Sequence, residues 1–61
     1  MTYFIRYRFR NPDTTEYHAY PSGNDLDEAL RRMKLQLGQS QWDRVEILEI
    51  REGGRTGRLI R

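Results

Sequence analysis

The chain has 61 residues, 33% of them charged, and contains no cysteine. A chain of this length forms a single domain, residues 1–61, and buries only about 60% of its unfolded surface. Eleven basic residues against nine acidic ones give a net charge of +2, which is too even to indicate nucleic-acid binding by itself. Without cysteine there is neither a disulfide nor a thiolate zinc site.

The sequence shows no membrane or export signal. No segment approaches the roughly 20 apolar residues of a membrane span. Residues 2–10, TYFIRYRFR, contain no apolar run followed by a small-residue cleavage site. These features favour a cytoplasmic protein that does not enter a membrane.

Residues 2–10 alternate as a half-buried strand does. Tyr3, Ile5, Tyr7 and Phe9 fall on one face. The other face carries Thr2, Phe4, Arg6, Arg8 and Arg10. Residues 11–14 have turn chemistry, and a second strand is predicted over about 15–20.

The first hairpin has a preferred register. With Arg10 opposite Glu16, Phe9 faces Tyr17 and Arg8 faces His18. Apolar side chains then meet on one face, and bases meet an acid or a ring on the other. A shift by one residue would mix the two faces.

Residues 25–38 carry the only clear helical period. The apolar stripe consists of Leu26, Ala29, Leu30, Met33 and Leu37. Asp25 and Glu28 have the spacing of a capping box, and Gly38 is placed to end the helix. Because one amphipathic helix cannot bury its own stripe, we expect it to cover one face of a sheet.

The C-terminal third predicts a second hairpin. After a short link at residues 39–41, a strand over about 42–52 ends at Gly53-Gly54, which suits a two-residue turn. That turn places Glu49 opposite Arg58 and Ile47 beside Ile60. The expected fold is α+β: ββαββ, a four-stranded mainly antiparallel sheet in the order 2-1-3-4, with one helix on one face.

The third strand has apolar residues on both faces. Val45 and Ile47 share one side, while Leu48 and Ile50 share the other. Either a bulge changes the alternation, or the side away from the helix carries an apolar patch of Val45, Ile47 and Ile60 covered by a second copy. The patch is the favoured interpretation, and it predicts a homodimer.

Catalysis and metal binding are poorly supported. His18 is the only histidine, and both serines lie in turn or linker positions, so no nucleophile–base pair is placed. No ligand-spaced pair indicates a metal, and Gly53 to Gly57 lack the lysine and following helix of a phosphate loop. We therefore expect no enzyme activity, no cofactor and no small-molecule substrate.

The uncovered sheet face is the candidate binding surface. It would carry Phe4, Arg6, Arg8, Arg10, His18 and Tyr20. We expect this face to bind a protein partner or a second copy. In size and plan alone, the chain is similar to small phage or mobile-element proteins that inhibit or regulate by occlusion. The alternative is nucleic-acid binding, because rings can stack on bases and arginines can hold phosphates. The simplest explanation is a solvated face, partly neutralised by Glu16 and Glu46.

Overall fold

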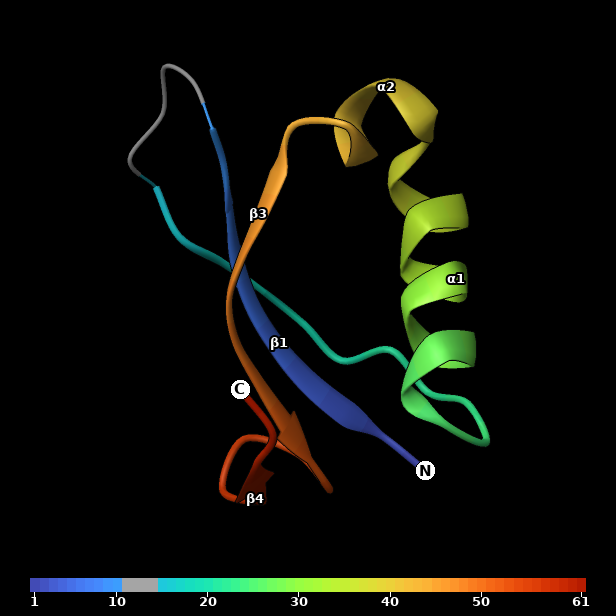
Figure 1. The fold of residues 1–61 in the computed structure, drawn as a ribbon, viewed down its shortest axis with the longest axis vertical. Helices are drawn as coiled ribbons and strands as arrows, with labels where there is room; N and C mark the ends of the chain where they lie inside the picture. The colour runs from blue at the N-terminus through green and yellow to red at the C-terminus, as the bar shows by residue number, and fades with distance from the viewer. Residues whose placement is uncertain (11–14) are drawn as a thin grey trace.

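The computed structural model describes residues 1–10 and 15–61. Its elements are β1 (Tyr3–Phe9), β2 (Tyr17–Ala19), α1 (Leu26–Leu37), α2 (Gln39–Trp42), β3 (Val45–Glu52) and β4 (Arg58–Leu59). The strands form one open sheet in the order β2-β1-β3-β4, with every neighbouring pair antiparallel. Helix α1 stands on one side of this sheet (Figure 1). The predicted ββαββ plan is confirmed, with the short helix α2 added, and the predicted turn at 11–14 lies outside the described residues.

Helix α1 begins and ends at the predicted signals. The Asp25 side chain accepts a hydrogen bond of 2.9 Å from the Glu28 backbone N–H. The Glu28 carboxylate accepts one of 3.0 Å from the Asn24 N–H, which satisfies a second donor at the helix start. Gly38 has φ +88°, a conformation that favours glycine, and its N–H donates to the Lys34 carbonyl at 2.9 Å.

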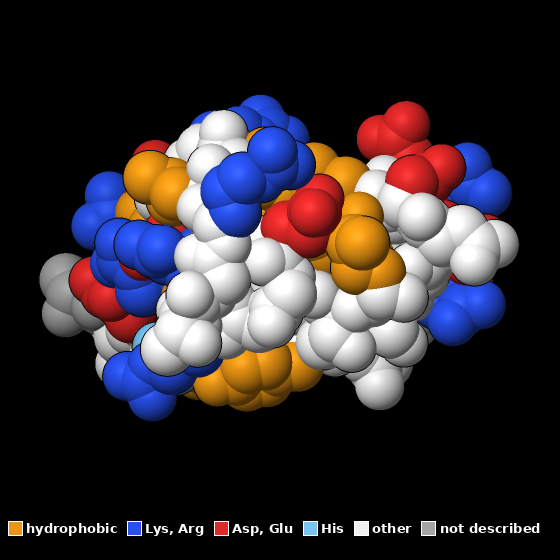
Figure 2. All heavy atoms as spheres, turned by 90° about the horizontal axis from the view of Figure 1, so that it is seen from below, with side chains coloured by type: hydrophobic (Ala, Val, Ile, Leu, Met, Phe, Trp, Pro, Cys, Tyr) orange, Lys and Arg blue, Asp and Glu red, His pale blue; other side chains and the backbone are white. Residues whose placement is uncertain are grey.

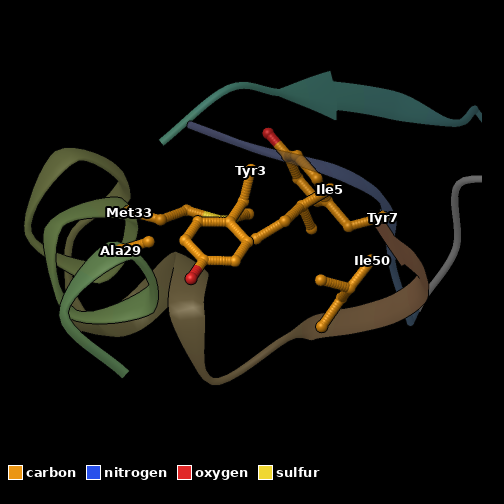
Figure 3. Packing of buried hydrophobic residues seen from close by; sticks show 6 residues of the cluster. All are labelled: Tyr3, Ile5, Tyr7, Ala29, Met33 and Ile50. Carbon is orange, nitrogen blue, oxygen red and sulfur yellow. The ribbon is translucent and has the colours of Figure 1, made fainter. Parts of the chain in front are cut away.

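The core forms between α1 and the sheet. Its buried members are Tyr3, Ile5 and Tyr7 from β1, Ala29 and Met33 from α1, and Ile50 from β3 (Figure 3). The remaining stripe residues of α1 are half-buried against this cluster, whereas Leu35 is 78% exposed. The predicted helix stripe and the predicted inner face of β1 are therefore confirmed.

The link after Gly38 differs from the prediction. Residues 39–41 belong to α2, and β3 begins at Val45 rather than near Trp42. Two contacts hold this turn of helix: the Trp42 N–H donates to the Gly38 carbonyl at 2.9 Å, and the Gln39 amide donates to the Asp43 carboxylate at 2.8 Å. Trp42 thereby packs against the core instead of continuing the strand.

The first hairpin is displaced by two residues from the predicted register. The structure pairs Tyr7 with Tyr17 and Arg6 with His18, so the predicted pairing of Arg8 with His18 is wrong. The Tyr17 ring stacks on Tyr7 at 5.7 Å and meets the Phe9 ring at 5.5 Å. Because side chains alternate with a period of two, the displacement leaves every residue on its predicted face.

The second hairpin turns through five residues instead of two. β3 and β4 pair Arg51 with Leu59 and Glu52 with Arg58, so Glu49 does not face Arg58. Gly53 and Gly54 have φ +90° and +105°, as a glycine turn requires. The turn closes later, where the Gly57 N–H donates to the Gly54 carbonyl at 3.0 Å.

A bulge in β3 explains its two-sided apolar pattern. β1 pairs Arg6 with Glu49 but pairs the next residue, Tyr7, with Ile47, which leaves Leu48 as the extra residue. Val45 and Ile47 consequently pack against the core on the α1 side.

Ile60 lies beside Ile50 rather than beside Ile47, and it is 37% exposed. Its N–H donates to the carbonyl of Ile50, a core residue, at 2.8 Å. The expectation that Val45, Ile47 and Ile60 form a patch on the uncovered side is therefore wrong. The dimer predicted from that patch loses its structural basis.

The five-residue turn makes a testable prediction at Gly57. A Cβ added there would lie 1.9 Å from the Glu52 carbonyl oxygen, so the turn must open to admit it. We expect Gly57→Ala to lower the free energy of unfolding by about 1–3 kcal/mol, the usual cost of overpacking. Chemical denaturation measures this change.

Thr56→Ala is the matched control in the same turn. Thr56 is exposed, so its substitution should change stability by no more than about 0.5 kcal/mol. Equal stability of the Gly57→Ala and Thr56→Ala variants would contradict the turn geometry.

Candidate binding surface

The side of the sheet opposite α1 carries the predicted site, and we call it the open face. Cross-strand pairing arranges it in rows, because paired residues share a face. The first row pairs Phe4 with Arg51 and Arg51 with Leu59, and the second pairs His18 with Arg6 and Arg6 with Glu49. The third row pairs Arg8 with Glu46.

Apolar side chains gather at one end of the open face, on either side of Arg51. Phe4 is only 3% exposed, because its ring meets the His18 ring at 5.3 Å and the Tyr20 ring at 5.6 Å. Two side chains at this end stay in solvent: Tyr20, beside Phe4, is 53% exposed, and Leu59, beyond Arg51, is 55% exposed. Phe4 is thus buried in a small ring cluster outside the main core. Tyr20 and Leu59 are the apolar side chains at this end that a partner could reach.

The other end is an ion-pair network centred on Arg6. The Arg6 guanidinium donates to the Glu16 carboxylate at 2.7 Å and to the Glu49 carboxylate at 3.1 Å. Glu49 also accepts a bond from Arg51, whose guanidinium donates to the Gly57 carbonyl at 3.0 Å. The network therefore ties the residue before β2 to β1, β3 and the turn before β4.

The charges of this network cancel. Arg8 on β1 forms a further ion pair with Glu46 on β3. The paired groups are the arginines Arg6, Arg8 and Arg51 and the glutamates Glu16, Glu46 and Glu49. Since each arginine has a carboxylate partner, these residues add no net charge to the open face.

The ion pairs shift the pKa values of Glu49 and Arg6. Hydrogen bonds from Arg51, and then from Arg6, hold the pKa of Glu49 below its ordinary value. Bonds to Glu16 and Glu49 raise the pKa of Arg6. Both groups are consequently charged at neutral pH.

The structure brings together most of the predicted site residues. The Phe4 ring contacts the rings of His18 and Tyr20, and Arg6 and Arg8 follow along the same side of β1. Exposed Arg10 lies just beyond β1, where its backbone N–H donates to the Arg44 carbonyl at 2.8 Å.

Three residues of this face were missed from the sequence: Glu49, Arg51 and Leu59. Glu46 and Glu49 are three residues apart, a spacing that would put them on opposite sides of an unbroken strand. The sequence nevertheless held a signal for the bulge: both carboxylates can pair with the alternating arginines of β1 only if one extra residue lies between them.

Neither a metal centre nor a cavity is evident in the part of the chain that the structure describes. Within residues 1–10 and 15–61, no cluster of three histidine or acidic side chains could hold a metal ion, and no pocket is present. In the same part of the chain, no helix has the length and apolar character needed to cross a membrane.

Comparison with protein-family models, curated proteins and solved structures found no match to this chain. Any function assigned to the chain therefore rests on its sequence and structure alone.

The ion-pair network predicts a pH effect that depends on Glu49. Because the folded-state pKa of Glu49 is lowered, its charged form stabilises the fold above the ordinary glutamate pKa of about 4.3. That contribution is lost as the pH falls through the lowered pKa. We expect Glu49→Gln to be less stable than the unchanged chain at pH 7, with the difference shrinking as the pH is lowered from about 4 to 2.

Thermal unfolding of both proteins across this pH range provides the measurement. A stability difference that stays constant down to pH 2 would show that the Glu49 charge does not contribute to the fold.

Proposed function

We propose that this protein is a non-catalytic binding protein that engages a protein partner through the open face. The observation that carries the proposal is the first row of that face, where exposed Tyr20 adjoins the buried Phe4 and exposed Leu59 lies on the far side of Arg51. Aromatic side chains and arginine are enriched at protein interfaces, and exposed apolar groups gathered on one face mark binding sites. The neutral ion-pair network would form the polar part of the contact.

Pairing of the arginines favours a protein over a nucleic acid. Arg6, Arg8 and Arg51 are bound to glutamates, so phosphates would have to displace carboxylates from them. The same glutamates would repel a phosphate backbone, which supplies most nucleic-acid affinity. Figure 2, which views one end of the molecule, likewise shows basic and acidic side chains intermingled with apolar ones, with no field of a single sign.

The mode of action that requires only binding is occlusion of a partner's surface. A typical stable interface covers about 800 Å² on each partner. The chain exposes 4279 Å², so such an interface would take about a fifth of its surface. One side of the sheet would suffice, and an inhibitor or regulator of this kind needs no further domain.

Leu59→Asp tests the proposal. Leu59 lies on the open face and is 55% exposed, so the substitution should change stability by about 0.5 kcal/mol or less. We expect it to weaken partner binding at least tenfold, because a charge would enter the apolar part of the interface. The measurement uses immobilised protein to capture partners from a cell lysate, with the captured protein then titrated against each variant.

Leu35→Asp is the matched control, since Leu35 is 78% exposed on α1. A partner retained by Leu35→Asp and lost by Leu59→Asp supports the proposal, whereas the reverse pattern assigns binding to the helix. Salt-sensitive binding to random oligonucleotides, with no protein captured, would favour the nucleic-acid alternative.

A further inference from the structure

The outer edge of β3 is only partly covered by β4. Pairing with β4 is confined to Arg51 and Glu52, and is extended by bonds from the Ile50 N–H to the Arg61 carbonyl at 2.9 Å and from Ile60 to Ile50. In Figure 1, β4 lies beside only the lower end of β3. Among the described residues, no strand pairs with the 45–49 segment on the side away from β1.

The pairing shows toward which edge the backbone groups of this segment point. Successive residues of an antiparallel strand turn their N–H and C=O groups toward opposite edges. The Arg44 carbonyl accepts a bond from Arg10, so Arg44 faces β1. Val45 and Ile47 therefore direct their backbone groups to the outer edge, and the bulge separates them from Ile50, whose groups are already bonded there.

The opposite edge of β3, which pairs with β1, shows which side chains complement the 45–49 segment. β1 places Phe9 opposite Val45, Arg8 opposite Glu46 and Tyr7 opposite Ile47. A residue in a sheet presents one side chain to neighbours on both edges. The same pattern, with a basic residue between two aromatic ones, therefore fits the outer edge, where Glu46 is half-buried and has two carboxylate oxygens to share.

We propose that the outer edge of β3 binds an extended segment of a partner protein, in which aromatic residues alternate with arginine or lysine. The segment runs antiparallel to β3, in the same direction as β4, and bonds to the backbone groups of Val45 and Ile47. Strand addition of this kind draws affinity from the backbone and specificity from alternate side chains. It concerns the edge of the sheet, so it stands whether or not the open face binds a partner.

A second copy of the chain is the less favourable occupant. In a twofold dimer, the β3 strands of two copies would pair antiparallel through the backbone groups of Val45 and Ile47. Glu46 would then lie opposite Glu46 of the other copy. Like charges directly opposite one another destabilise a strand pair. The bulge also twists the edge, a feature that discourages edge-to-edge association of identical sheets.

The test uses capped eight-residue peptides in which tyrosine and phenylalanine alternate with arginine, titrated against the full chain by fluorescence anisotropy. Two further peptides carry backbone N-methyl groups on every second residue, one at the odd positions and one at the even. In an extended peptide, either the odd or the even N–H groups point toward β3, and methylation of that set removes the hydrogen bonds to it. We therefore expect one methylated peptide to bind at least tenfold more weakly and the other to bind within about twofold of the parent. A peptide with glutamate replacing arginine should also bind at least tenfold more weakly.

Amide NMR locates the bound peptide. The proposal expects the N–H signals of Val45 and Ile47 to move and their hydrogen exchange to slow. It is overturned if the parent peptide does not bind, if the two methylated peptides bind equally, or if the signals that move belong to the open face instead. Sedimentation showing a dimer that the peptide cannot dissociate would assign the edge to a second copy and overturn the proposed occupant.

Discussion

The bulge at Leu48 is the constraint on which both sides of the sheet depend. One extra residue in β3 changes the alternation between Glu49 and Ile47. Val45 and Ile47 face α1 before the bulge, and Ile50 faces it afterwards. In an unbroken strand, those two aliphatic side chains would lie on the open face and the core would lose them.

The extra residue, Leu48, also determines where the carboxylates of β3 lie. Because the bulge lies between them, Glu46 and Glu49 reach the open face three residues apart and meet Arg8 and Arg6. Arg51 joins the network from the same strand. The six paired side chains of the network thereby carry no net charge and offer a partner polar groups. The bulge also leaves Val45 and Ile47 with backbone groups directed away from β1, next to the end of β4.

Local signals were enough to predict the strand order and the helix. The Asp25 cap, the Gly38 termination and the alternation of β1 are properties of short segments, and the structure keeps all of them. The faces of Phe4, Arg6 and Tyr20 followed from alternation alone. They survived a hairpin register that was wrong by two residues, because a displacement of two leaves the faces unchanged.

The remaining features depend on contacts that local patterns do not determine. Opposite charges in the C-terminal hairpin could pair in more than one register, and Gly53-Gly54 suits a five-residue turn as well as a two-residue one. Burial of Phe4 requires two rings from the next part of the chain, His18 and Tyr20, to close over it. The bulge was one of two explanations for the pattern of β3, and only the pairing with β1 distinguishes them.

Cross-strand nuclear Overhauser effects between β1 and β3 test most directly which side chains of β3 face α1 and which lie on the open face. The structure predicts contacts that pair Arg6 with Glu49, Tyr7 with Ile47 and Arg8 with Glu46. Contacts pairing Tyr7 with Leu48 and Arg8 with Ile47 would show an unbroken strand. Val45 would then leave the core side, and Glu46 and Glu49 could not both pair with the arginines of β1.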